Sequence, residues 1–254
     1  MKAFILADEK THMPRNVNMF NAMEGFRQLG VETILFYDVE KLNNIENEDI
    51  VVGGIGAVRK YLREKGKHLP DLDYPEELGK FYGRKILRTT SDELLSGNLK
   101  LPVFIKPVQG KAFTGFCCKA FKDLAGRIEP GENIDIYCSN VINIRAEWRA
   151  FVRYGNILDI RHYYGDLDVF YDLNIVKDMI KCYQHRSPAA YALDIGVTDT
   201  GETIVVEVND GYSMGAYGLD PLLYAKFLYA RWAEIMDVED CLAFDLIDKT
   251  GMSL

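Results

Sequence analysis

The strongest constraint on the fold is a change in the pattern of apolar residues near residue 83. Before it, strand-length apolar stretches at residues 2–7, 32–37 and 49–52 alternate with two segments in which apolar residues recur at helical spacing. After it, short apolar stretches separated by turn residues predominate. Alternating strands and helices predict a layered α/β lobe with a partly parallel sheet, whereas runs of strands predict α+β units.

This change divides the chain into three segments. We expect residues 1–83 to form the α/β lobe and to end in a Pro- and charge-rich linker at residues 67–82. Residues 84–142 and 143–254 are expected to form two further units. Asp220 followed by proline is typical of a helix start, and the helix after it is apolar on nearly every side. We expect that helix to be buried, and it could contribute to a homodimer surface.

The charge and cysteine content exclude several classes of protein. The 30 basic and 38 acidic residues give a net charge of −8, so a chain-wide basic footprint for nucleic acid is absent. The five cysteines form no CxxC pair, which argues against a disulfide framework or a zinc cage and favours a reducing, cytoplasmic compartment. No stretch approaches eighteen apolar residues and the first residues do not resemble a signal peptide, so we expect no membrane partner.

Three oxygen-bearing side chains are predicted to meet at the ends of two neighbouring strands. Asp194 lies in one strand, and Glu207 and Asn209 lie in the next, after a short turn. Glu207 and Asn209 are two residues apart and share one face of their strand. Carboxylate and amide oxygens suit Mg²⁺, which completes its shell with water and phosphate oxygens. Alternatively, these residues are solvated polar groups of an edge strand, although burying Glu207 without a cation or donor would be costly.

Basic residues in the middle segment could bind phosphate. Lys106 ends the apolar stretch PVFIKP, which places its ammonium group at the margin of a sheet. Residues 110–115 have glycine at both ends and could fold over a triphosphate with their backbone N–H groups. Lys106 could equally be a strand-end lysine that only reaches solvent. Arg84 and Lys85 form a second basic pair.

Arginines also fall on two predicted strands further along the chain. Arg149 and Arg153 are four residues apart and share a face, and Arg161 lies on the following strand beside His162. A guanidinium group that points inward from a sheet pairs with a carboxylate or a phosphate. His162 has no second histidine at ligand spacing, which favours a structural or substrate-contacting role. The anion near the arginines could be a ligand, or it could be Glu147, Asp159 or Asp166.

Two common nucleotide motifs are absent. The glycines at 53, 54 and 56 do not complete GxGxxG, because residue 59 is arginine, and a tight strand-to-helix turn explains them. There is no GxxxxGK[ST] segment. A dinucleotide site and a P-loop are therefore not expected.

The order and spacing of these features resemble the ATP-grasp superfamily over residues 84–219. The resemblance rests on the lysine of VFIKP with its glycine-bearing loop, on EWRAFV, and on LDIGVT followed by VVEVNDGYSMGAYGL. RHYYGD and NDGYSMGAYGL look closest to a poorly characterised clade of small bacterial and phage ATP-grasp proteins. The resemblance implies an ATP-grasp fold, in which an N-terminal α/β lobe precedes two α+β subdomains that enclose the nucleotide.

The resemblance also implies an activity. ATP-grasp proteins of this type are carboxylate–amine (or thiol) ligases that use ATP and Mg²⁺ and form an acyl phosphate. The partners would be a small-molecule or peptide carboxylate and an amine. Two alternatives stay open, namely a phosphotransferase acting on a small-molecule hydroxyl group and a nucleotide-binding module without turnover.

Residue roles follow from the same resemblance. Asp194, Glu207 and Asn209 would hold Mg²⁺, while Arg149 and Lys106 would be the catalytic residues. Nucleotide contacts would come from Arg84, Lys85, Lys106, Lys111, Thr114, Tyr137, Ser139, Asn140 and Arg149. The acceptor site would be shaped by Arg161, His162, Tyr212, Ser213 and Tyr217. The backbone at residues 137–139 would read adenine, residues 110–115 would form a lid, and Asn140 stands where the family usually carries an acidic ribose contact.

Overall fold

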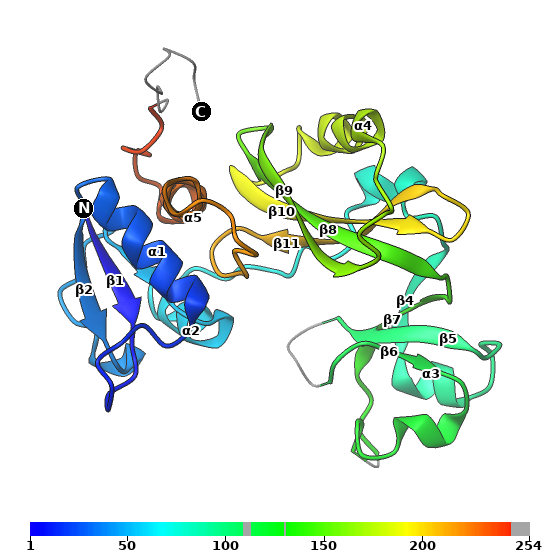
Figure 1. Ribbon diagram of the computed structural model, residues 1–254. Coiled ribbons are helices and arrows are strands. Elements are labelled where there is room, and N and C mark those ends of the chain that lie inside the picture. Colours follow the sequence, from blue (N-terminus) through cyan, green and yellow to red (C-terminus); the bar gives the residue numbers. More distant parts are fainter. Residues whose placement is uncertain (109–112, 130, 245–254) are drawn as a thin grey trace.

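The computed structural model describes residues 1–108, 113–129 and 131–244. Within these residues the strands form three sheets, which follow one another along the chain. Figure 1 shows helix α5 (Pro221–Met236) lying between the first sheet and the third. No helix among the described residues is long and apolar enough to cross a bilayer.

The first sheet is a small parallel sheet accompanied by two helices. It contains the strands β1 (Lys2–Leu6), β2 (Glu32–Phe36) and β3 (Ile50–Val52), the helices α1 (Val17–Gln28) and α2 (Ile55–Glu64), and the 3-10 turn η1 (Val39–Lys41). Strand β1 lies in the middle and pairs in parallel with both neighbours. The sheet is therefore wholly parallel, where the sequence predicted a partly parallel one.

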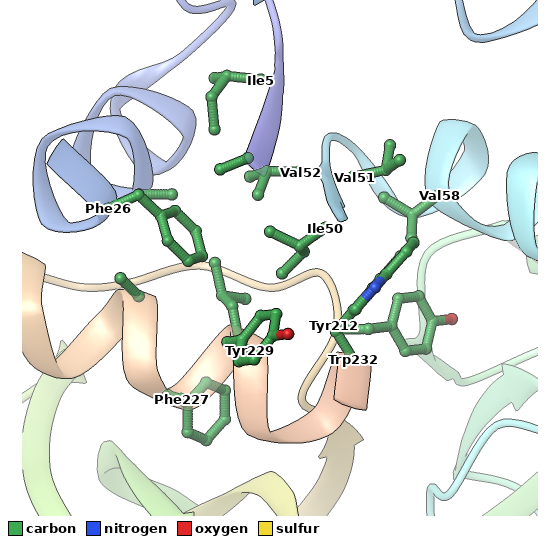
Figure 2. Packing of buried hydrophobic residues seen from close by; sticks show 14 of the residues in the cluster. Ile5, Phe26, Ile50, Val51, Val52, Val58, Tyr212, Phe227, Tyr229 and Trp232 are labelled. Atoms are coloured by element: carbon green, nitrogen blue, oxygen red, sulfur yellow. The ribbon is translucent and has the colours of Figure 1, made fainter. Parts of the chain in front are cut away.

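Helix α5 completes the core of this lobe. Figure 2 shows Tyr229 and Trp232 of α5 in the same buried cluster as Phe26 of α1. Gly25 permits the close approach of the two helices, because a Cβ atom there would lie 1.9 Å from the carbonyl oxygen of Pro221. Helix α5 is thus buried, as predicted, and other segments of the same chain cover it. This packing removes the reason for expecting the helix at a homodimer surface.

The second sheet is antiparallel and has one face that is buried and apolar. Its strands in spatial order are β4 (Ile86–Thr90), β7 (Asp135–Asn140), β5 (Val103–Pro107) and β6 (Phe116–Cys118), with helix α3 (Ser91–Leu95) and the 3-10 turn η3 (Phe121–Leu124) beside them. Ile105 and Cys138 lie opposite each other in its buried core. Lys106 and Tyr137, the next pair in the register, therefore project from the other face.

The third sheet is also antiparallel and is covered on one face by helix α4. Its strands in spatial order are β11 (Thr203–Asp210), β10 (Ala190–Thr198), β8 (Ile144–Arg153) and β9 (Asn156–Gly165), and α4 spans Leu173–Tyr183. Trp148 and Ala150 share a buried cluster with Val176 of α4. Figure 1 shows α4 over one side of this sheet and the second sheet beyond the other side. The side away from α4 is therefore the side that faces the second sheet.

The segment at residues 67–82 is packed rather than free. Leu78 is completely buried and Tyr82 nearly so, and both belong to the core of the third sheet. Leu78 lies in the 3-10 turn η2 (Glu76–Phe81), and Tyr82 directly follows this turn. Asp73 forms an isolated bridge with Val208 of β11, whose N–H donates to the Asp73 carbonyl at 2.8 Å. The segment runs from the first lobe to the second sheet, and in addition its apolar residues and its backbone are used to hold β11.

Candidate functional site

The three predicted metal-binding side chains lie together in the third sheet. Asp194 of β10 stands directly opposite Glu207 of β11. The amide nitrogen of Asn209 donates to Asp194 Oδ2 and to Glu207 Oε1, at 3.0 Å each. Residues directly opposite on antiparallel strands project to one side, so the short turn between β10 and β11 is what brings the three together.

Arg149 holds Asp194 from the neighbouring strand β8. Its Nε and Nη2 atoms donate to the two oxygens of Asp194 at 2.7 Å each, and both residues are buried. Burial raises the pKa of Asp194 to about 6, although the guanidinium group opposes this. The two hydrogen bonds from the guanidinium group favour the ionised carboxylate. The Arg149 guanidinium also donates to the Gly215 carbonyl at 3.4 Å and lies 4.8 Å from the centre of the Tyr217 ring.

Lys106 reaches the same group from the second sheet. Its Nζ donates to Glu207 Oε2 at 2.7 Å and to Asp73 Oδ1 at 2.6 Å. Burial alone would lower the pKa of Lys106, but the two carboxylates outweigh burial and raise it. Burial alone would raise the pKa of Glu207, but the charge of Lys106 lowers it. The result is a continuous chain of hydrogen-bonded charges from Asp73 to Asp194, which joins the second and third sheets.

Two cavities meet at this chain of charges. The larger, of about 750 Å³, lies between α2, β5 and β11 and is lined by Lys106, Glu207 and Asn209 among others. The smaller, of about 300 Å³, is lined by Asn209, Arg149 and the loop that follows β11. Asn209 borders both. A volume of several hundred Å³ with a few convergent polar groups is typical of a small-molecule site.

The sequence agrees with a known family over this region. The family described as ATP-grasp domain, R2K clade family 2, matches residues 81–227, which is more than half of the chain. The chain belongs to this ATP-grasp family. The fold expected from the resemblance is thereby confirmed, with mixed helices and sheets. Among curated proteins the chain has no match.

Solved ATP-grasp structures have the same fold at low sequence identity. A RimK-domain ATP-grasp protein from Sphaerobacter thermophilus has a TM-score of 0.59 at 16% identity, over 93% of this chain and 98% of that one. D-alanine–D-alanine ligase from Bacillus anthracis has a TM-score of 0.56 at 15% identity, over 93% and 97%. An L-amino acid ligase from Bacillus licheniformis has a TM-score of 0.54 at 13% identity, over 91% and 74%. At these identities the likeness concerns the fold.

Arg84 and Lys85 form the basic pair that directly precedes β4. The guanidinium group of Arg84 donates to the carbonyls of Tyr82, Val205 and Val206, at 2.8–2.9 Å. Arg84 therefore ties the start of the second sheet to β11 and has these donors occupied by the backbone. Lys85 is exposed. The expectation that Arg84 supplies a second phosphate-binding cation is not supported by this geometry.

The predicted adenine-reading backbone is also occupied. Residues 137–139 lie in β7, which is hydrogen-bonded to β4 on one side and to β5 on the other. The Ser139 hydroxyl donates to the Asn140 carbonyl at 3.2 Å, and Asn140 is exposed. A central strand has no free edge, so the predicted adenine contact is not supported by this geometry, and the backbone without a strand partner is at residues 141–143, between β7 and β8. The Tyr137 ring meets Tyr74 edge-on at 4.9 Å.

The glycine-bearing loop is described only in part. Lys111 lies outside the described residues, as does the first half of the predicted lid, residues 110–112. Thr114 is exposed and lines the larger cavity. Gly115 lies close to β5, because a Cβ atom there would be 2.7 Å from the Phe104 ring and 3.2 Å from Lys106 Cβ.

The predicted acceptor residues divide between two faces of the third sheet. Arg161 stands opposite Arg149 on the site face and pairs with Asp159 at 2.6 Å. His162 stands opposite Trp148 on the other face, and the two rings meet edge-on at 5.4 Å. His162 therefore lies on the face away from Arg161, because adjacent residues of a strand point to opposite faces.

The loop after β11 connects the sheet to the N-terminal lobe. The Tyr212 hydroxyl accepts a hydrogen bond from Arg59 Nε at 2.5 Å, and the Ser213 hydroxyl donates to the Gly53 carbonyl at 2.7 Å. Both side chains line the smaller cavity. Tyr217 is half-exposed and lies over Arg149. These three residues stay candidates for the acceptor site.

Three candidate site residues were not predicted from the sequence. Asp73 comes from the packed connection and binds Lys106. The Tyr163 ring stacks on Tyr217 at 4.9 Å, and its hydroxyl donates to Glu147 at 2.6 Å. Burial raises the pKa of Glu147, while the hydrogen bond from Tyr163 lowers it. Glu147 and Tyr163 could have been found from strand alternation, because they share the face of Arg149 and Arg161.

Proposed function

We propose that this chain is an ATP-dependent ligase, which joins a carboxylate to an amine (or thiol) through an acyl phosphate and releases ADP and phosphate. Membership of the ATP-grasp family supports ATP-dependent ligation. The observation that carries the proposal is the convergence of Asp194, Glu207 and Asn209 with two cations, Lys106 and Arg149, where two cavities meet. Two of the solved relatives are, by name, ligases of amino acids, which is consistent with this chemistry.

The donor set fits Mg²⁺. Glu207 and Asp194 offer carboxylate oxygens, and Asn209 directs its amide nitrogen at both of them, which leaves its amide oxygen for a cation. Among the described residues no three His, Cys, Asp or Glu side chains are grouped to hold a metal ion, so the amide of Asn209 would be needed. Bound there, Mg²⁺ would neutralise charge on the β- and γ-phosphates.

Lys106 and Arg149 would act on the phosphates. Lys106 is held in place by Asp73 and Glu207, and phosphoryl oxygens can replace a carboxylate as its partner. The guanidinium group of Arg149 is fixed by Asp194 and by the Gly215 carbonyl, and it borders the smaller cavity. A cation fixed in advance stabilises charge that develops in the transition state without further reorganisation.

The two cavities would bind different substrates. The larger cavity, next to the glycine-bearing loop, would take the phosphates and the carboxylate that receives the γ-phosphoryl group. The smaller cavity, lined by Tyr212 and Ser213, would take the amine. The acyl phosphate would then form beside Asn209, which borders both cavities, and the amine would attack it there.

Product analysis tests the reaction type. The chain is incubated with ATP, Mg²⁺ and pools of carboxylates and amines, and ADP and products are measured. We expect ADP release that requires both a carboxylate and an amine, together with a new amide. ADP release with a phosphoester and no amide would identify a phosphotransferase instead. Tight binding of Mg–ATP without ADP release from any pool would identify a module without turnover.

A substitution tests the metal assignment separately. Glu207→Gln keeps the size of the side chain but removes the charge, so we expect much weaker binding of Mg–ATP, loss of turnover and an unchanged fold by circular dichroism. Glu202→Gln is the matched control, because Glu202 lies exposed in the turn of the same hairpin. Unchanged nucleotide binding and turnover in Glu207→Gln would refute the assignment.

A further inference from the structure

A third cavity lies beside the C-terminal end of helix α2, next to the proposed active site. It has a volume of about 500 Å³ and lies between the end of α2 and residues 67–71. Its cationic side chains are Arg63, Lys67 and the more deeply placed Arg59, and His68 stands beside them. Leu62 and Leu69 supply apolar lining. We call this cavity the basic groove.

The charge of the basic groove is opposite to that of the chain. Its lining contains Arg59, Arg63 and Lys67 against a single carboxylate, Asp71, so its formal charge is 3 − 1 = +2 with histidine neutral. The whole chain carries −8. Arg59 and Asp71 form an ion pair with each other. The surplus positive charge therefore belongs to Arg63 and Lys67, for which the described part of the chain provides no ion-pair partner.

The basic groove adjoins the larger cavity of the proposed active site. Arg59, Arg63 and Asp71 line both cavities. The larger cavity leads from these residues to Lys106 and Glu207. A ligand lying in the groove could therefore extend past Arg63 to the proposed site of phosphoryl transfer without crossing the body of the protein.

We propose that the basic groove binds an acidic peptide, whose carboxylate side chains pair with Arg63 and Lys67 while one end enters the larger cavity. A guanidinium and an ammonium group on a partly apolar floor suit glutamate side chains, which carry two methylene groups below each carboxylate. The inference deepens the proposed ligase by naming its substrate class, and to that extent it rests on it. Arg63 also lies in the last turn of α2, where a cation stabilises the helix end, and that role alone predicts no peptide binding.

A binding experiment without nucleotide tests the groove independently of catalysis. Fluorescein-labelled hexaglutamate is titrated with the full chain at low salt, and anisotropy is recorded. We expect saturable binding that weakens as salt is added, and no binding of hexaglutamine. The double variant Arg63→Glu/Lys67→Glu should weaken hexaglutamate binding at least about tenfold, since attraction at two positions becomes repulsion.

The matched control has the same change of net charge on a remote helix. Lys177 and Lys181 are exposed on α4, which covers the opposite face of the third sheet, and Lys177→Glu/Lys181→Glu should leave the affinity within about twofold. Equal losses in both double variants would overturn the groove, because they would reflect net charge alone. No binding by the unmodified chain would overturn it too, as would tighter binding of a single-stranded oligonucleotide of equal charge.

Turnover separates this inference from the proposed function. If hexaglutamate supports ADP release, Lys67→Glu, which lies outside the larger cavity, should raise its KM about threefold and leave kcat within about twofold, and a loss confined to kcat would overturn the groove. If hexaglutamate binds as described but no pool supports ADP release, the groove stands and the ligase proposal fails. If ADP release occurs while hexaglutamate affinity is the same in both double variants and the unmodified chain, the ligase stands and the groove fails.

Discussion

Arg149 and Asp194 face each other across strands β8 and β10, joined by two hydrogen bonds of 2.7 Å in a buried position. Bringing both charges out of water is expensive, and this geometry offsets the cost only because both carboxylate oxygens are bound. The pair also connects the interior of the third sheet with the proposed active site. It is part of the core of the third sheet, and its arginine borders the smaller cavity.

The first prediction concerns the stability of this pair. Arg149→Met should lower the free energy of unfolding by about 3–5 kcal/mol, because it leaves the Asp194 carboxylate buried without a cation. Urea unfolding measures the loss. Adding Asp194→Asn should recover much of it, since the isolated charge is then removed. Arg186→Met is the control, because Arg186 forms an exposed ion pair with Glu77 and should cost at most about 1 kcal/mol. A single Arg149→Met variant as stable as the unmodified chain would contradict this account.

The second prediction separates two roles for Arg84. Its three hydrogen bonds to backbone carbonyls should make Arg84→Ala less stable by about 2–3 kcal/mol, because buried carbonyls lose a charged donor. Lys85→Ala should change stability by less than about 0.5 kcal/mol, since Lys85 is exposed. Urea unfolding and nucleotide titration are performed on both variants. Weaker ATP binding by Arg84→Ala with unchanged stability would instead favour the phosphate contact that the resemblance implied.

The contrast between Asp194 and Arg84 shows what local sequence can predict. The register of β10 and β11 follows from one short turn, so the meeting of Asp194 with Glu207 could be predicted from spacing. The capping of α5 by Asp220 is equally local, and the structure confirms it. Arg84 instead binds carbonyls 121 and 122 residues away. Nothing in its neighbours along the chain indicates that the backbone of β11 will pass beside it.

The connection at residues 67–82 also makes contacts that its own sequence does not predict. Its prolines and charges are typical of a linker, and the composition does not reveal that Leu78 is buried under the third sheet. Asp73 reaches Lys106 only because this segment bridges to β11. His162 is different, because strand alternation already places it on the face opposite Arg161. The two residues were grouped as neighbours in sequence, and the alternation itself was sufficient to separate them.

The third prediction concerns the aromatic pair over Arg149. Tyr163→Phe keeps the ring that stacks on Tyr217 but removes the hydroxyl that donates to Glu147. We expect a loss of about 1 kcal/mol in the free energy of unfolding, because the half-buried Glu147 carboxylate loses its donor. Tyr217→Phe is the control, since the same stack is kept and Glu147 is untouched. Equal stability of the two variants would show that the hydroxyl of Tyr163 is not needed by Glu147.

The last prediction is a change in pH dependence on loss of Lys106. In the unmodified chain the pKa of Glu207 is lowered below its ordinary value of 4.5, because the charge of Lys106 outweighs burial. Ionised Glu207 therefore stabilises the fold above about pH 4.5, and this stability is lost as the pH falls through the lowered pKa. In Lys106→Met the largest influence against burial is gone and only the hydrogen bond from Asn209 and the charge of Arg149 oppose it, so the pKa of Glu207 should rise above 4.5 and ionisation should destabilise the variant.

The difference in stability between Lys106→Met and the unmodified chain should therefore grow as the pH is raised from about 4 to about 7. Urea unfolding at a series of pH values gives this difference directly, and other titrating groups largely cancel because both chains contain them. Asp73 adds to the effect with the same sign, since Lys106 also lowers its pKa against burial. The double variant Lys106→Met/Glu207→Gln should show a much smaller growth, because the main titrating group is gone. A difference that stays constant across this range would mean that Lys106 does not set the ionisation of Glu207, and the charge chain at the proposed site would lose its central link.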